Sequence, residues 1–139
     1  MSLSIRNQLP GTVIAVTTGE VMATVRVRLD GGQEITAAIT RESVGDLGLV
    51  RGTAVRALVK STEVSLATAA VEGVSIRNQL PGTVTDITRG AAMSSVKVTV
   101  AGGTLTAAIT TDAAHDLGLA AGSPVVALIK STEISLATR

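Results

Sequence analysis

Apolar and polar residues alternate in two stretches of this chain. Residues 21–30 (VMATVRVRLD) carry Val, Ala or Leu at every odd position, and residues 92–101 (AMSSVKVTVA) show the same alternation with apolar or small residues at the even positions. A period of two predicts β-strands with one buried face. The sequences DGG at 30–32 and AGG at 101–103 follow, and their glycines can supply the positive φ of hairpin turns.

The remaining pattern predicts short strands and one helical turn in each half of the chain. Further strands are expected near residues 11–18, around 35–39, and near 53–60 and 63–68. Residues 41–47 form the helical stretch, with Thr40 as N-cap and Gly48 at its C-terminal end; Thr110 and Gly118 repeat these roles. Five strands with a helical turn between the third and fourth indicate an OB-like small barrel, which the strands near 53–60 and 63–68 would close.

The chain is a tandem duplication. Residues 4–13 (SIRNQLPGTV) recur letter for letter as residues 75–84, and the sequences TAAIT, DLGL, KSTE and SLAT each occur twice in the same order. The fold class is therefore predicted as all-β, with two tandem OB-like small β-barrel modules over residues 1–69 and 74–139, each with a short helical turn. Modules this small bury little surface alone, so we expect them to pack on each other or on further chains.

Composition excludes several kinds of site. The 139 residues include no Cys, Phe, Tyr or Trp and one histidine, and 12 Lys and Arg oppose 11 Asp and Glu. Thiolate sites, disulfides and histidine-rich metal centres are therefore excluded, and no bare-cation site is expected. Nucleic-acid binding is not expected either, because stacking rings and a basic surface are both missing. No apolar run reaches the length of a signal peptide or a membrane span.

Few residues suit catalysis. The repeated acids Asp46 and Asp116 are interpreted as facing solvent or a neighbour, and His115 is interpreted as a surface residue because Gly45 stands at its position in the first copy. We therefore expect no enzyme activity and no cofactor. Met22 and Met93, at matched positions on the polar faces of their strands, are interpreted as an interface between modules.

The polar residues that do repeat are hydrogen-bond donors and cations. They are Ser4-Ile5-Arg6-Asn7 with Ser75-Ile76-Arg77-Asn78, Thr40 with Thr110, and Lys60-Ser61-Thr62 with Lys130-Ser131-Thr132. Convergent N–H and O–H donors with a cation suit a small tetrahedral oxyanion, whereas a bare metal ion would need carboxylates or imidazoles. From their chemistry alone, a purely structural role of these segments as turns is favoured over anion binding.

These motifs, in this order and twice, resemble the Mop (TOBE-type) molybdate-binding module, and the whole chain is similar to the di-Mop molbindins. The resemblance implies an OB-like fold, a homotrimer of six modules, and molybdate or tungstate bound at interfaces between modules. One module would give Ser4, Ile5, Arg6 and Asn7, or Ser75, Ile76, Arg77 and Asn78. The other would give Thr40, Lys60 and Ser61, or Thr110, Lys130 and Ser131. Ser43 would add a hydroxyl that Ala113 lacks in the second copy.

Three functions follow as hypotheses. The leading one is cytoplasmic molybdate or tungstate binding for storage and homeostasis, without catalysis, nucleic acid or membrane. The alternative is a ligand-sensing regulatory module that acts through a partner protein, since the sequence contains no phosphate loop and no helix-turn-helix. An OB-fold nucleic-acid binder is the third, and the composition argues against it.

Overall fold

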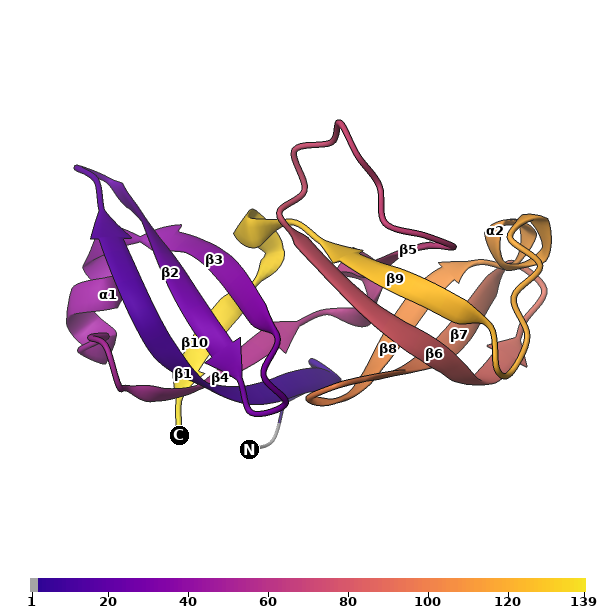
Figure 1. Cartoon of the computed structure of the whole chain (residues 1–139), viewed down its shortest axis with the longest axis horizontal. Helices are drawn as coiled ribbons and strands as arrows, with labels where there is room; N and C mark the ends of the chain where they lie inside the picture. Colours follow the sequence, from indigo (N-terminus) through magenta and orange to yellow (C-terminus); the bar gives the residue numbers. More distant parts are fainter. Residues whose placement is uncertain (1–2) are drawn as a thin grey trace.

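The computed structural model describes residues 3–139 and consists mainly of two curled, five-stranded antiparallel sheets side by side (Figure 1). The first repeat contains β1 (Asn7–Thr18), β2 (Met22–Leu29), β3 (Glu34–Thr40), α1 (Arg41–Leu47), β4 (Ala54–Val59), the 3-10 turn η1 (Ser61–Glu63) and β5 (Ser65–Ala67). The second contains β6 (Asn78–Arg89), β7 (Met93–Val100), β8 (Gly103–Thr110), α2 (Thr111–Asp116), β9 (Pro124–Ile129), η2 (Ser131–Glu133) and β10 (Ser135–Thr138). The predicted all-β class with two OB-like modules is confirmed.

The alternating stretches form the second strand of each sheet, as predicted. Buried and exposed residues alternate along all of β2, and in β7 the even positions are buried. Val25 and Val27 are 0% exposed, as are Val96 and Val98. The opposite face of β2 keeps its arginines in solvent, so a single pleated strand separates the core from a polar surface.

The first strand of each module is long enough to pair with two neighbours because it is bent. β1 pairs with β4 and with β2, and its register with β2 shifts between Val13 and Ala15. β6 shows the same shift between Val84 and Asp86. A bulge of this kind increases the local bend and twist of a strand, which curls each sheet into an open half-barrel.

The helical turns confirm the predicted caps, with one difference. The Thr40 side chain accepts a hydrogen bond from the backbone N–H of Ser43, and Gly48 is the left-handed C-cap with φ 62°. Thr110 is likewise the N-cap of α2. Gly118 also has φ 62°, but α2 ends one residue earlier than predicted, with Leu117 as C-cap. The glycine therefore serves the turn after the helix rather than its cap.

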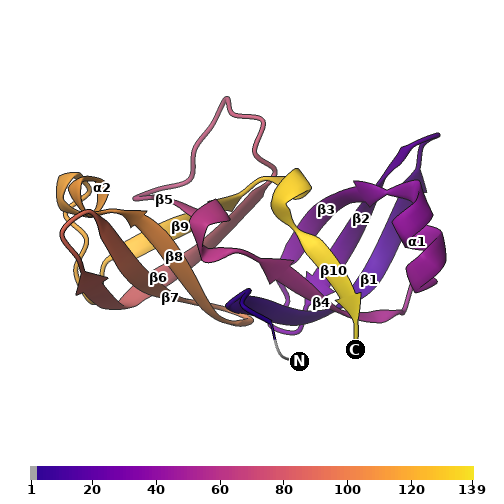
Figure 2. The ribbon, with the colours of Figure 1, turned by 180° about the vertical axis from the view of Figure 1, so that it is seen from behind.

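The expectation that each module closes with its own last strand is wrong. β5 pairs with β9 of the second sheet, and β10 pairs with β4 of the first, so the two repeats exchange their final strands. Figure 2 shows β10 alongside β4 from behind. A tight hairpin after β4 would need positive φ, and residues 60–64 contain no glycine and no positive φ. The chain passes through η1 and continues into the neighbouring sheet.

The exchange joins the modules around one continuous core. Its buried aliphatic side chains come from both repeats, from Leu9 and Val13 to Ile134 and Leu136. The Arg139 guanidinium donates to both carboxylate oxygens of Asp30 at 3.2 and 3.3 Å and to the Gly11 carbonyl at 3.2 Å, so the C-terminal end is tied to the first module. The boundaries 1–69 and 74–139 remain a prediction about the repeat units, since each sheet contains a strand of the other repeat.

Candidate functional site

The first candidate pocket joins two of the predicted segments. β1 and β4 are antiparallel with Asn7 opposite Val59, so the residues before β1 lie beside those after β4. A cavity of about 280 Å³ is lined there by Ser4, Ile5, Arg6, Lys60, Ser61 and Thr62. The Ser-Ile-Arg segment and the Lys-Ser turn that meet in it belong to the same repeat, whereas the resemblance assigns them to different modules.

The second candidate pocket repeats this arrangement and adds a wall. Asn78 opposes Ile129 in the pairing of β6 with β9. A cavity of about 520 Å³ is lined by Ser75, Ile76, Arg77, Lys130, Ser131 and Thr132, together with Thr24 and Thr36 of the first module. Each pocket thus has two cationic side chains and no carboxylate in its lining.

The two serines after the lysines are the most informative residues of these pockets. The hydroxyl oxygens of Ser61 and Ser131 are buried, and neither has a hydrogen-bond partner within residues 3–139. A buried hydroxyl without a partner is costly, and such groups in native proteins call for an explanation. Both serines line pockets that also contain a Lys and an Arg, so a group with acceptor oxygens bound there is a candidate partner for these hydroxyls.

The arginines brace the Ser-Ile segments. Arg6 donates from Nε to the carbonyl of Ser4 at 3.2 Å and from Nη2 to that of Leu3 at 2.9 Å. Arg77 donates in the same way to Ser75 at 3.3 Å and to Val74 at 3.2 Å. Each guanidinium therefore shapes the loop beside its pocket and leaves its positive charge at the rim.

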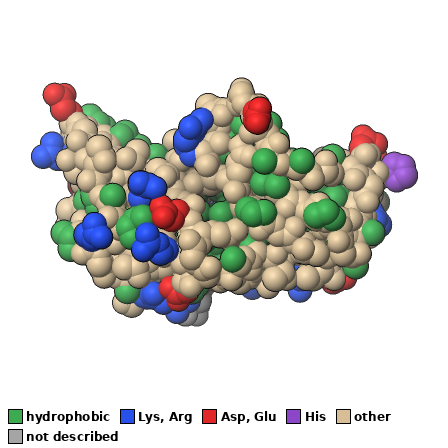
Figure 3. Space-filling model, in the orientation of Figure 1, with side chains coloured by type: hydrophobic (Ala, Val, Ile, Leu, Met, Phe, Trp, Pro, Cys, Tyr) green, Lys and Arg blue, Asp and Glu red, His purple; other side chains and the backbone are tan. Residues whose placement is uncertain are grey.

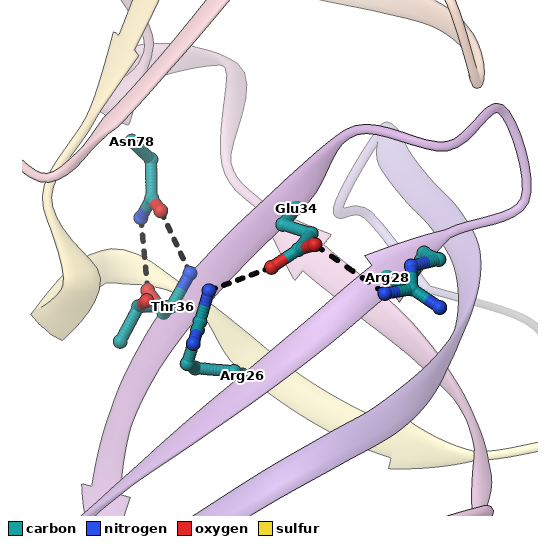
Figure 4. A network of polar contacts seen from close by, with 5 residues as sticks. All are labelled: Arg26, Arg28, Glu34, Thr36 and Asn78. Carbon is teal, nitrogen blue, oxygen red and sulfur yellow. Dashed lines mark hydrogen bonds and ion pairs between the residues drawn. The ribbon is translucent and has the colours of Figure 1, made fainter.

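Asn7 and Asn78 use their side chains to connect the modules. The Asn78 amide accepts from the Thr36 backbone N–H at 2.8 Å and donates to the Thr36 carbonyl at 2.9 Å (Figure 4). The Asn7 amide makes the same pair with Thr106, at 2.7 and 2.9 Å. Asn7 is 1% exposed and Asn78 3%. Neither residue lines either of the two candidate pockets, so direct anion binding by these two asparagines stays a prediction.

Thr40 and Ser43 lie apart from the lysines. Thr40 lines a different hollow, with Glu20, Val21, Arg41 and Glu42. Its hydroxyl donates to Ser43 Oγ at 2.8 Å. Within one chain these residues do not meet Lys60 or Ser61.

The second-copy counterparts are also apart from their lysine. Thr110 accepts from the Ala113 N–H at 3.1 Å, and it does not line the pocket of Lys130 and Ser131. One chain thus separates the Thr part of the predicted site from the Lys-Ser part in both repeats.

Sequence reasoning missed two of the lining residues. Thr24 stands on the polar face of β2, and Thr36 opens the repeated TAAIT sequence. Nothing local marks either as part of the pocket, because the other lining residues follow them by about forty positions or more. Between residues 3 and 139 there is no group of three or more His, Cys, Asp and Glu that could hold a metal ion. No helix in that range is both long and apolar enough to cross a membrane.

Comparison with known proteins agrees with the predicted resemblance. The TOBE domain family matches residues 3–66 and 74–136. The molybdenum transport protein ModE of Herbaspirillum seropedicae is 40% identical over 141 residues, which cover 100% of this chain and 52% of that protein. Molybdenum-pterin-binding protein MopB of Rhodobacter capsulatus is 43% identical over 136 residues, covering 96% and 50%. The chain spans about half the length of these curated relatives.

A solved structure matches over its full length. The molybdate-bound crystal form of the cytoplasmic molybdate-binding protein ModG superposes with a TM-score of 0.97 at 38% identity, covering 100% of both chains. The similarity includes both modules and their relative placement. The chain therefore belongs to the TOBE-domain family, as a member built from two tandem modules of the Mop type.

Proposed function

We propose that this protein binds molybdate or tungstate, without catalysis, at the two pockets described above. The buried, unpartnered hydroxyls of Ser61 and Ser131 carry the proposal. Each lies with a Lys and an Arg in a pocket whose lining has no acid. A tetrahedral dianion offers acceptor oxygens for the hydroxyl and charge for the two cations, whereas a metal cation would find no anionic ligand there.

The relatives support the identity of the anion. ModG binds molybdate in its crystal structure, and its chain matches this one throughout. The MopB protein is named for molybdenum-pterin binding. Sulfate has the same charge and shape but is smaller, so a rigid pocket fitted to molybdate would hold its donors too far from sulfate.

We infer further that complete sites form between chains, in a homotrimer of six modules. Thr40 and Ser43 lie away from Lys60 and Ser61 within one chain, so a neighbouring chain would have to bring the two parts together. Apolar side chains near Thr40 are available for such a contact: Val21 is 71% exposed and Met22 46%, and the matched Met93 is 48% exposed. Ligand binding at such a contact would stabilise the assembly.

Storage and homeostasis in the cytoplasm are the biological role that we propose. The alternative role is a ligand-sensing module that acts through a partner protein. The 40% identity to ModE over the whole chain supports this alternative. A partner captured only in the presence of molybdate would support sensing over storage.

Calorimetric titration of the full chain with molybdate, tungstate, sulfate and phosphate tests the binding proposal. We expect heat from the first two and at least tenfold weaker binding of sulfate. The double variant S61A/S131A should bind molybdate more weakly, since it loses one buried hydroxyl in each pocket. The matched control S65A/S135A changes exposed serines of the exchanged strands and should bind normally. Equal affinity for sulfate and molybdate, or unchanged binding by S61A/S131A, would overturn the proposal.

A further inference from the structure

The two pockets are built from equivalent segments of the repeats, but they differ in size and in lining. The pocket of Arg77 and Lys130 is about 520 Å³ and includes Thr24 and Thr36, whereas the pocket of Arg6 and Lys60 is about 280 Å³. The two extra lining residues, both threonines, come from the opposite module. Sequence identity between the repeats therefore does not make the pockets equal.

The wall of the larger pocket is held by the asparagine that follows Arg77. Asn78 binds the Thr36 backbone through both atoms of its amide, so β3 is fixed beside the Ser-Ile-Arg segment. Thr24 opposes Ala38 in the pairing of β2 with β3, which makes it a diagonal neighbour of Thr36 on the same sheet face. These two hydrogen bonds, here called the Asn78 clamp, thus hold two threonines in the lining of one pocket.

The charged side chains on the polar face of β2 and β3 are paired in a way that does not repel an anion. Glu34 is the nearest acid along β3, and its carboxylate is bonded to Arg26 at 2.7 Å and to Arg28 at 3.5 Å (Figure 4). Figure 3 shows Lys and Arg side chains gathered over the first module next to the hollow where the modules meet. The Glu34 carboxylate is therefore offset by two arginines.

The corresponding face of the second module is different. The pairing of β7 with β8 can be compared with that of β2 with β3. Ser95 then corresponds to Thr24, Lys97 to Arg26 and Thr104 to Glu34. Neither Ser95 nor Thr106 lines the smaller pocket, although Asn7 clamps Thr106 as Asn78 clamps Thr36. The smaller pocket is therefore formed by one repeat alone.

We propose that Thr24 and Thr36 are oxyanion donors of the larger pocket, which makes the two pockets of the chain unequal in affinity. This inference rests on the proposed function. Hydroxyls that reach a charged acceptor each strengthen binding by roughly tenfold. The pocket of Arg77 and Lys130 is the tighter one, and Thr24 and Thr36 both raise its affinity for the anion.

The test uses pairs of variants at matched positions of the full chain. Thr24→Val removes one hydroxyl and keeps a β-branched shape, and its matched control is Ser95→Ala. Thr36→Val is paired with Thr106→Val in the same way. Thr24 is exposed, so the substitution leaves the core intact, and the unfolding midpoint by far-UV circular dichroism checks the fold.

Titration with molybdate should resolve two classes of site in the unsubstituted protein. We expect Thr24→Val and Thr36→Val to weaken the tighter class roughly five- to tenfold, whereas Ser95→Ala and Thr106→Val leave both classes unchanged. Equal effects within a pair, or no effect of Thr24→Val, would overturn this inference and leave the proposed function standing. Absence of molybdate binding in the unsubstituted protein would overturn both.

Discussion

Asn78 and Thr36 form a side-chain-to-backbone pair that reproduces one step of a β-ladder between two modules, with hydrogen bonds of 2.8 and 2.9 Å. Thr36 belongs to β3, which is the last strand of its sheet, so the amide takes the place of a missing neighbouring strand. Exposed strand edges tend to pair with other chains. The asparagine both joins the modules and covers part of that edge.

Asn78→Ala should therefore destabilise the folded chain. The substitution leaves the N–H and C=O of Thr36 without partners, and we expect the free energy of unfolding to fall by about 1–3 kcal/mol. Urea unfolding followed by far-UV circular dichroism measures it, since the chain has no Trp or Tyr for fluorescence. Gln79→Ala, which removes an amide bonded to the exposed linker at Val71, is the control. Equal unfolding midpoints for the two variants would contradict a role of the clamp in stability.

Lys60→Ala and Lys130→Ala should each weaken anion binding at one pocket. Each variant loses a charge-assisted contact, which corresponds to roughly ten- to a hundredfold in affinity. Calorimetry should show one site class affected per single variant and both in the double variant. Lys97→Ala removes an exposed lysine that lines neither pocket and serves as the control; a double variant that binds like the unsubstituted protein would rule out the assignment.

Gly31→Ala should destabilise the contact between the two hairpin turns. A Cβ at Gly31 would overlap the backbone carbonyl of Ala101, so the turns would have to move apart, at a cost of about 1–3 kcal/mol. Gly45→Ala provides the contrast, because Gly45 lies within α1 and a Cβ there meets nothing within 4 Å. We expect that variant to gain about 0.5–1 kcal/mol. Thermal unfolding of both distinguishes the cases, and a stabilised Gly31→Ala would refute the contact.

Arg139→Ala should loosen β10 without unfolding the sheet. The guanidinium joins the chain end to Asp30 and to the Gly11 carbonyl, and its loss removes a partly exposed ion pair, so global stability should fall by no more than about 1 kcal/mol. Hydrogen exchange should accelerate in residues 135–138 and stay unchanged in β5, which lacks such a tie. Uniform acceleration in both strands would argue against this role for Arg139.

The fold could be predicted from the sequence where the information is local. The alternation of apolar and polar residues predicted β2 and β7, and Thr40 and Gly48 predicted the two ends of α1. The partner of a strand is not local information: residues 63–68 alternate equally well for either sheet. The turn after β4, which has no glycine at residues 60–64, is the one local sign that the chain does not fold back there.

The candidate site was predicted in part for the same reason. Repetition identified Lys60 and Ser61, and the structure places them with Arg6. Thr24 and Thr36 are brought to their pocket by a clamp from a distant part of the chain, so their local sequence carries no sign of it. The asparagines were identified as functional by resemblance, whereas their side-chain partners could be seen only in three dimensions.

The exchange of final strands sets the order in which the protein can be completed during its synthesis. The first sheet is completed by residues 135–138, which are synthesised after every strand of the second sheet. When the first repeat has been synthesised, one edge of β4 therefore still lacks its partner strand β10. The sheet that β5 joins has not yet been synthesised at that point. The first sheet cannot be completed before residues 135–138 have been synthesised, so a product that terminates before them lacks one strand of that sheet.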